Sequence, residues 1–155
     1  MIEVTSPDSA RLMGLLERLE HEHGIALLRG AAGDEFAAGE GDSLTLLIDD
    51  PLRAPEVWDV AVVLPEALAA LPAPPRVAVA DMATSRALGE RFDVRRYPAM
   101  LFRRAGDYVG VVHGMLDWDA FVPAIVGMLA APVQRAPGIG VPVRPAGAGG
   151  CSSGA

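Results

Sequence analysis

The sequence contains no lysine and only one cysteine, and both scarcities limit what the chain can do. All 13 basic residues are arginine. Because a disulfide needs two thiols, the single Cys151 excludes an internal disulfide, and it also excludes a cysteine-based metal cluster within one chain. Aromatic residues make up only 5% of the chain, yet hydrophobic residues reach 51%. That balance is typical of a folded domain rather than an intrinsically disordered chain.

Long apolar runs are also missing. The longest apolar stretch, from Ala120 to Val133, is interrupted by Pro123 and Pro132. It is shorter than the roughly 20 residues that a membrane-spanning helix needs. No basic segment followed by an apolar run stands at the amino terminus, so we expect no secretory signal. These absences predict a cytoplasmic protein that is not inserted in a membrane.

Acidic residues are concentrated in the first half of the chain. Residues 1–66 carry 14 acids and four arginines, whereas residues 67–131 carry six acids and seven arginines. The net charge of −7 argues against nucleic acid as a partner, because nucleic-acid affinity comes largely from basic contacts to phosphate. An acidic surface favours and orients a basic protein partner. The same charge also serves simply to keep a protein soluble.

The spacing of apolar residues predicts alternating helices and strands in one α/β domain. Ser6-Pro7-Asp8 supplies a cap candidate, a proline in the first turn and an acid, and Gly24 suits the end of the same helix. The predicted helices cover residues 7–23, 34–38, 56–71, 84–92 and 118–129, and the predicted strands cover 25–28, 44–48, 77–80, 99–103 and 108–113. This order indicates a central mixed β-sheet with helices on both faces.

The composition changes at Pro132. The last 24 residues contain four prolines and six glycines with few large apolar side chains. We therefore predict two regions, a folded domain over residues 1–131 and a disordered tail over residues 132–155, which contains Cys151.

Residues 77–128 resemble the carboxy-terminal half of a thioredoxin fold. The segment RFDVRRYPAMLFRRAGD, residues 91–107, is similar to the thioredoxin segment that leads into a cis-proline. The resemblance implies that Pro98 is that cis-proline and that Gly114 is the glycine beside its loop. It also implies a thioredoxin-like fold for the whole domain.

The redox motif of thioredoxins is absent from the front half. In thioredoxins a Cys-x-x-Cys opens a helix, and a proline follows five residues after the second cysteine. If Pro65 is that proline, Val57 and Val60 occupy the two cysteine positions. Thiol–disulfide exchange needs a thiolate, which valine cannot supply. We therefore predict no redox enzyme activity at this position.

Three motifs are similar to those of the hydrogenase-expression proteins called HyaE, HupG or HoxO. They are DDPLRAPEVWD at residues 49–59, RFDVRRYPA at 91–99 and GDYVG at 106–110, and Asp49 stands where a glycine or serine is common. The resemblance covers about residues 10–130. It implies a non-catalytic accessory chaperone for the maturation of a nickel-iron hydrogenase. Such a protein binds the small-subunit precursor, including its twin-arginine signal peptide, before export by the Tat route.

The residues that would meet such a peptide surround the lost cysteine positions. A twin-arginine signal has a basic segment followed by an apolar one, so its binder needs carboxylates beside an apolar surface. Around Pro98 the backbone is expected to pair with an extended chain by strand addition. The predicted partner-binding residues are the acids Asp49, Asp50, Glu56 and Asp59, the weaker candidate Arg53, and the apolar group Trp58, Tyr97, Pro98 and Met115.

Each of these acids also has a purely structural interpretation. Asp50 precedes a proline and can start a turn, while Glu56 and Asp59 favour a helix amino terminus. Two other functions stay open. One is a scaffold that recruits other hydrogenase accessory proteins, and the other, less favoured, is a thiol-dependent redox protein that uses Cys151.

No motif predicts a cofactor or a metal site. His21 and His23 are two residues apart, so they point to different faces of a helix, whereas a metal pair favours a spacing of four. The Gly138-Ile139-Gly140 segment lacks the strand-to-helix context of a dinucleotide-binding loop. We therefore predict that the protein binds neither.

Overall fold

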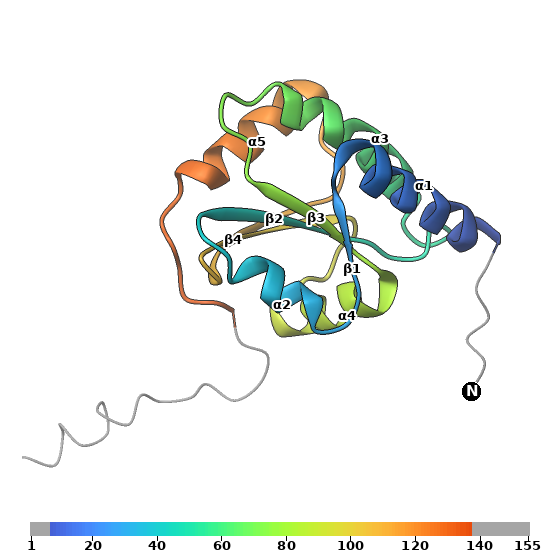
Figure 1. Cartoon of the computed structure of the whole chain (residues 1–155), viewed down its shortest axis with the longest axis horizontal. Coiled ribbons are helices and arrows are strands. Elements are labelled where there is room, and N and C mark those ends of the chain that lie inside the picture. Colours follow the sequence, from blue (N-terminus) through green and yellow to red (C-terminus); the bar gives the residue numbers. More distant parts are fainter. Residues whose placement is uncertain (1–6, 138–155) are drawn as a thin grey trace, which may run out of the picture.

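The computed structural model describes residues 7–137 and arranges them in five helices and five strands (Figure 1). In chain order they are α1 (Pro7–His23), β1 (Ala26–Leu28), α2 (Ala32–Ala37), β2 (Asp42–Leu47), α3 (Glu56–Ala69), β3 (Arg76–Ala80), α4 (Met82–Arg91), β4 (Ala99–Arg104), β5 (Asp107–His113) and α5 (Trp118–Ala130). The predicted order of elements is confirmed. Helix α4 begins two residues before its predicted start because the Asp81 side chain caps it, accepting a hydrogen bond from the Thr84 amide at 2.8 Å.

The strands form one mixed sheet in the order β1-β3-β2-β4-β5. Strands β1, β3 and β2 run parallel, whereas β4 is antiparallel to both β2 and β5. The central strand β2 is buried from Ser43 to its end, so its polar residues Ser43 and Thr45 are buried together with Leu44, Leu46 and Leu47. Strands β4 and β5 are joined by Ala105-Gly106, and both residues have positive φ, as a two-residue hairpin turn requires.

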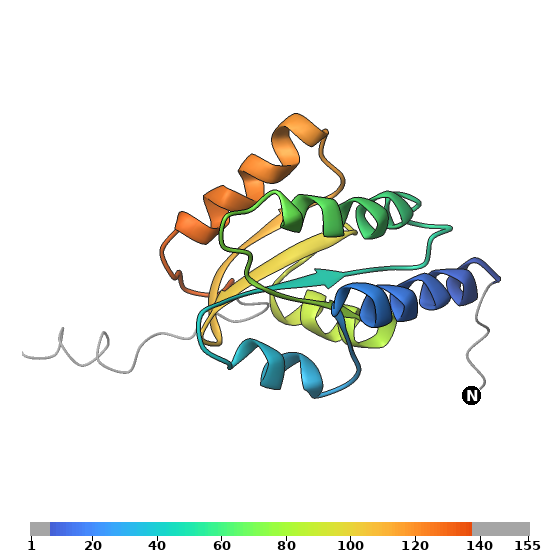
Figure 2. The ribbon, with the colours of Figure 1, turned by 45° about the horizontal axis from the view of Figure 1, so that its top comes forward.

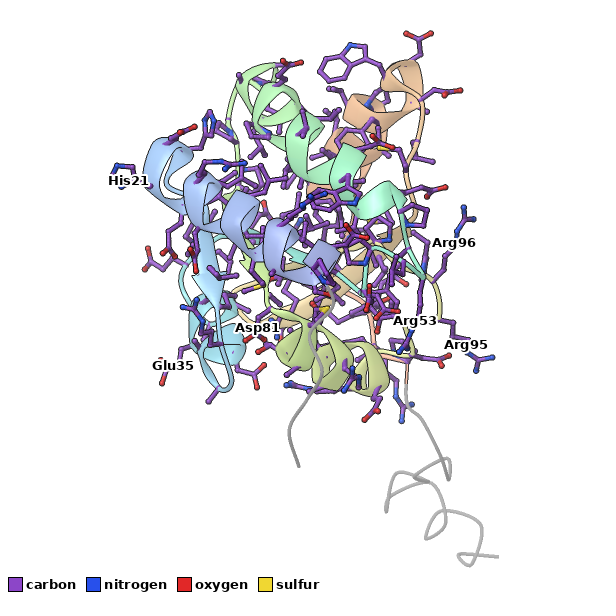
Figure 3. The ribbon with its side chains drawn as sticks, turned by 90° about the vertical axis from the view of Figure 1, so that its right-hand side faces the viewer. His21, Glu35, Arg53, Asp81, Arg95 and Arg96 are labelled. Carbon is purple, nitrogen blue, oxygen red and sulfur yellow. The ribbon has the colours of Figure 1, made fainter. Side chains whose placement is uncertain are left out.

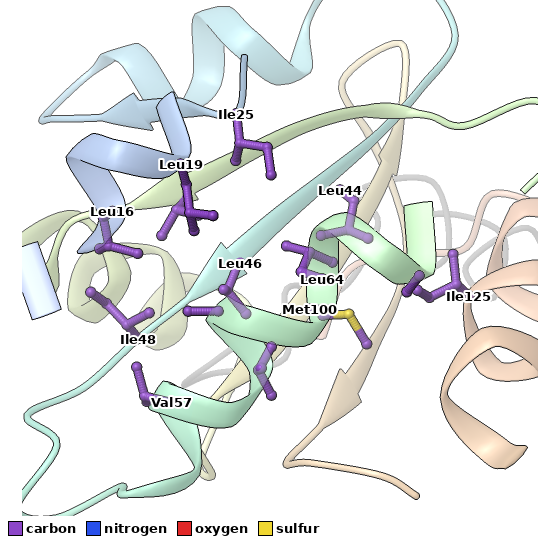
Figure 4. Close-up of a cluster of buried hydrophobic side chains, with 14 of the residues drawn as sticks. Leu16, Leu19, Ile25, Leu44, Leu46, Ile48, Val57, Leu64, Met100 and Ile125 are labelled. Carbon is purple, nitrogen blue, oxygen red and sulfur yellow. The ribbon is translucent and has the colours of Figure 1, made fainter. Parts of the chain in front are cut away.

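Helices cover both faces of the sheet, with α3 and α5 on one side and α2 and α4 on the other (Figure 2). Side chains of α1, α3 and α5 pack with the sheet in the larger core, which is drawn in Figure 4. The members of that core labelled there are Leu16, Leu19, Ile25, Leu44, Leu46, Ile48, Val57, Leu64, Met100 and Ile125. A smaller core beneath the opposite face joins Leu88 and Phe92 to Leu47 and Leu101. Among the described residues, no helix is long and apolar enough to cross a membrane.

The segment that follows α5 lies along the start of β5. The Gln134 amide donates to the Tyr108 carbonyl at 2.8 Å, and the Gln134 side-chain Nε2 donates to the Val109 carbonyl at 3.2 Å. Residues 132–137, the first part of the predicted tail, therefore have a defined position on the sheet. The rest of that tail, with Cys151 and Gly138-Ile139-Gly140, lies outside the described residues, so disorder there stays a prediction.

A buried arginine joins the sheet to the helices on its smaller-core side. Arg103, on β4, is only 2% exposed, and its Nη1 donates to Asp34 Oδ1 of α2 at 2.9 Å. Arg91, at the end of α4, donates to both carboxylate oxygens of Asp34 at 2.7 and 2.8 Å. Burial raises the pKa of Asp34, but the hydrogen bonds from Arg103 and Arg91 outweigh it and hold that pKa below its usual value. Asp34 therefore bridges α2, α4 and β4.

Replacing Asp34→Asn should destabilise the protein because it leaves the buried Arg103 without a negative partner. The carboxylate is partly exposed and water screens it, so we expect the free energy of unfolding at neutral pH to fall by about 1 kcal/mol. The wild-type advantage exists above the unfolded-state pKa, about 4. It is lost as the pH falls through the lowered folded-state pKa. Urea unfolding of the wild type and of Asp34→Asn between neutral pH and a pH below about 4 measures this difference in the free energy of unfolding.

Asp93→Asn is the matched control for this prediction. Asp93 pairs with Arg95 at 3.0 Å, but that pair is solvent-exposed, and asparagine tolerates the positive φ of 54° at this position. The control should change the free energy of unfolding by less than about 0.5 kcal/mol. If both variants lose stability equally, the Asp34 bridge has no special role.

Candidate functional site

The loop between β2 and α3 is held by its own aspartates. Asp49 Oδ1 accepts a hydrogen bond from the Asp50 amide at 2.8 Å, and Asp50 Oδ1 accepts one from the Leu52 amide at 2.9 Å. The Asp50 carbonyl accepts from the amides of Arg53 and Ala54, each at 2.9 Å. Asp50 therefore organises a turn, as expected for an aspartate that precedes a proline. Its carboxylate is only partly available to a partner.

The Tyr97–Pro98 peptide bond is cis, as the thioredoxin resemblance implied. The Pro98 carbonyl accepts a hydrogen bond from the Gly114 amide at 2.6 Å, so Gly114 lies beside this loop as expected. Gly114 has a φ of +74°, and a Cβ at this position would lie 3.1 Å from the Arg96 guanidinium, so glycine suits the site. Pro98 has no amide donor and its carbonyl is engaged. The strand addition that we predicted here therefore depends on the neighbouring Tyr97.

The two cysteine-equivalent positions face the core. Val57 and Val60 lie in the first turns of α3 and are 0% and 1% exposed. On the same turns, Glu56 is half-buried and Asp59 is exposed. This end of the helix therefore presents carboxylates to the surface and valines to the interior.

Four predicted site residues line one hollow of about 330 Å³ beside this helix end. They are Asp49, Arg53, Glu56 and Tyr97, and the wall is completed by Ala54, Pro55, Arg95 and Arg96. Arg53, Arg95 and Arg96 gather on one side of the molecule in Figure 3. Arg95 and Arg96 were not among the predicted site residues, although their position directly before Tyr97-Pro98 is a local signal that they line the same loop.

The hollow carries more positive charge than the sequence predicted. Three guanidinium groups line it against the two carboxylates of Asp49 and Glu56. Arg95 is paired with Asp93, whereas no carboxylate of the described residues lies within ion-pairing distance of Arg53 or Arg96. The rim formed by Arg53, Arg95 and Arg96 would therefore repel a basic peptide and attract an acidic group.

Glu56 connects α3 to the segment between β5 and α5. Its Oε2 accepts a hydrogen bond from the Met115 amide at 3.1 Å, across 59 residues of sequence. The Met115 side chain packs against the larger core. Glu56 therefore has a positioning role in addition to the negative charge that it offers at the surface.

Trp58 does not share the hollow with Tyr97. It lines a second hollow of about 720 Å³, which lies between α1 and α3 together with Leu15 and Val62. Asp59 is exposed on α3 and has no hydrogen-bond or ion-pair partner among the described residues. The predicted apolar group is thus divided between two sides of α3.

Tyr97 is fixed against helix α4. Its hydroxyl lies directly over Gly89, and a Cβ at residue 89 would overlap it. Partial burial raises the pKa of the Tyr97 phenol, and the negative charges of Asp49 and Glu90 raise it further. The phenol therefore stays neutral at physiological pH.

Metal-ligating side chains do not gather in the part of the chain that the structure describes. No group of three or more His, Cys, Asp or Glu residues suited to a metal ion occurs there. His21 and His23 are both exposed in the last turn of α1. The absence of a cofactor and of a metal stays a prediction.

Comparison with known proteins relates the chain to one family. The family model described as Hydrogenase-1 expression protein HyaE matches residues 15–121. The chain is 39% identical over 146 residues to the hydrogenase expression/formation protein HoxO of Cupriavidus necator, covering 93% of this chain and 91% of that protein. It is 35% identical over 127 residues to the hydrogenase expression/formation protein HupG of Bradyrhizobium diazoefficiens, covering 79% and 86%.

A solved structure shows the fold. A mutant thioredoxin from Halobacterium salinarum superposes with a TM-score of 0.55 at 20% identity, covering 69% of this chain and 92% of that one. The thioredoxin-like fold expected from the sequence is confirmed.

Replacing Gly89→Ala should displace Tyr97 from the hollow, because the added Cβ overlaps the Tyr97 hydroxyl. We expect the free energy of unfolding to fall by about 1–3 kcal/mol, as for other overpacked sites. Gly127→Ala on α5 is the matched control, since a Cβ there meets nothing within 4 Å. Alanine should stabilise that helix by up to about 1 kcal/mol. Adding Tyr97→Phe should restore part of the stability lost by Gly89→Ala, and urea unfolding of the double mutant measures this coupling.

Proposed function

The chain belongs to the HyaE family of hydrogenase expression proteins and acts in hydrogenase maturation, and from this premise we propose that it is a non-catalytic chaperone. Its client is the small-subunit precursor of a nickel-iron hydrogenase, including the twin-arginine signal peptide. It holds this precursor in the cytoplasm before export by the Tat route.

The observation that carries the proposal is the surface of the first turns of α3. The positions that bear thiols in thioredoxins hold valines packed in the core, whereas the acids Glu56 and Asp59 stay at the surface. A helix end of this composition has no nucleophile for disulfide chemistry. It has carboxylates that match guanidinium groups.

The arginine rim directs the client to one side of this helix end. Arg53, Arg95 and Arg96 repel the basic segment of a signal peptide from the 330 Å³ hollow. Asp59 is exposed and free of other partners among the described residues, so it is the strongest acceptor for that segment. We therefore place the arginine pair of the client at Asp59, with Glu56 as the neighbouring charge.

The arginine rim also supports the alternative function, a scaffold for other hydrogenase accessory proteins. Arg53 and Arg96 lack carboxylate partners among the described residues. An acidic segment of a second accessory protein would complement them. Both functions belong to hydrogenase maturation. The two surfaces meet at Glu56, so substitution of Asp59 tests the first and substitution of Arg53 or Arg96 tests the second.

Neutralising the two acids should weaken binding of a hydrogenase small-subunit signal peptide. The double variant Glu56→Gln/Asp59→Asn removes two negative charges, and glutamine keeps an oxygen for the Met115 amide. Exposed ion pairs are worth up to about 1 kcal/mol each, so we expect the Kd to rise about tenfold. The effect should shrink as salt increases. Calorimetric titration of the full chain with a synthetic signal peptide measures the Kd.

Glu35→Gln/Glu40→Gln is the matched control, because it removes the same charge from exposed residues at α2 and the loop after it. That double variant should leave the Kd nearly unchanged. Equal weakening by both double variants would show that only the overall negative field matters. No effect of either would place the basic segment elsewhere.

The protein should show no disulfide reductase activity. Val57 and Val60 cannot form a thiolate, so reduction of insulin by dithiothreitol should proceed at the same rate with and without the protein. Cys151→Ala should leave signal-peptide binding unchanged. Insulin reduction that disappears in Cys151→Ala would instead favour the thiol-dependent alternative.

A further inference from the structure

A continuous groove runs between α1 and α3. The hollow of about 720 Å³ at Trp58 is followed by one of about 240 Å³ that extends to Pro65. Leu15, Arg18 and Val62 line both, so the two hollows form a single groove. We call it the α1–α3 groove.

An apolar strip of Leu15, Trp58 and Val62 runs along the α1–α3 groove, and the other walls carry the polar side chains of Asp8, Arg11, Arg18, Glu22, His23 and Glu66. Val62 is 60% exposed, and Leu15 and Trp58 are half-buried beside it, so the three side chains form one contiguous apolar patch. The groove is open beside Gly14 of α1, where even a Cβ would meet nothing within 4 Å. Arg18 borders the groove from α1, where its aliphatic stem adds to the apolar surface and its guanidinium remains in water.

We propose that the α1–α3 groove binds the apolar segment of the client's signal peptide, an inference that rests on the function proposed above. A twin-arginine signal places its basic segment before its apolar segment. Carboxylates stand at both ends of the groove, with Asp59 next to Trp58 on α3 at one end and Glu22 and Glu66 beside Pro65 at the other, so an apolar segment lying in it has an acid close to the arginines that precede it. We place the basic end at Asp59, the acid to which the proposed function assigns the arginine pair, and the apolar segment along Val62 toward Pro65.

The length of the groove suits a short helical segment. Trp58 and Glu66 are eight residues apart on α3, which corresponds to about 12 Å at 1.5 Å per residue. That distance accommodates about two turns of a client helix, whose apolar side would lie against Trp58, Val62 and Leu15. Binding of this kind follows the helix-in-groove mode, in which residues spaced three or four apart supply the contacts.

Trp58 can report directly on occupation of the groove. The chain has two tryptophans, and Trp118→Phe, on α5, leaves Trp58 as the only one. Addition of a synthetic hydrogenase small-subunit signal peptide should shift the emission of Trp58 to the blue, since the peptide removes its indole from water. A second peptide keeps the arginine pair but has serine and asparagine in place of the apolar residues. It should produce no shift and bind at least tenfold more weakly.

Val62→Asp should raise the Kd of the intact signal peptide at least tenfold. Val126→Asp is the matched control, because Val126 is an exposed valine on α5, 47% accessible and outside the groove. It should leave the Kd unchanged. Because Val62 is exposed, both variants should fold, which circular dichroism checks; Val62→Ser replaces Val62→Asp if the latter does not fold.

The outcomes separate this inference from the proposed function. If the peptide binds wild type and Val62→Asp equally and leaves the Trp58 emission unchanged, the groove is not its site, although the chaperone function stands. If neither peptide binds the wild-type chain, both proposals fail. If the Trp58 emission shifts with protein concentration alone, a second copy occupies the groove and the inference is overturned.

Discussion

The burial of strand β2 on both faces is the constraint on which the rest of the molecule depends. Its residues from Ser43 to Leu47 are covered by helices on each side, so both helical layers are required. Its antiparallel register with β4 pairs Leu47 with Ala99, and this sets the Tyr97–Pro98 loop beside the chain that leaves β2. The following turn then begins α3 at the same edge. The site therefore lies where the central strand ends.

Arginine rather than lysine holds the ends of the strands to the surrounding chain. Arg76 donates from Nε to the Glu40 carbonyl at 3.1 Å and from Nη2 to the Gly39 carbonyl at 2.9 Å, and its Nη1 donates to Phe36. Arg104 pairs with Asp42 through Nε, and its other two guanidinium nitrogens donate to the carbonyls of Leu129 and Ala131. A planar guanidinium reaches several acceptors at once, which an ammonium group does not do as well. The basic residues at these strand ends therefore use the several donors of arginine, which lysine would not replace.

Local patterns predicted most of the fold but only part of the site. The helices and strands followed from apolar spacing, and the cis Tyr97–Pro98 bond followed from the family resemblance. The contact of Glu56 with Met115 spans 59 residues, and that of Arg103 with Asp34 spans 69. Neither leaves a local signal, because such pairs depend on how distant elements pack. The prediction also placed Trp58 and Tyr97 in one apolar group. They line different hollows, because Trp58 packs beside helix α1, and this packing has no local signal in the sequence.

The first turns of α3, which hold valines where thioredoxins have cysteines, separate two chemically different surfaces. Successive residues on a helix point about 100° apart, so Glu56 faces the β5–α5 segment, Trp58 faces α1, and Asp59 faces solvent. The arginine rim lies on one side of this helix end and the apolar groove on the other. The valines anchor the same turns in the core. For the function that we propose, Asp59 is available for a partner, whereas Glu56 also keeps its contact with Met115, and α1 contributes to the groove together with α3.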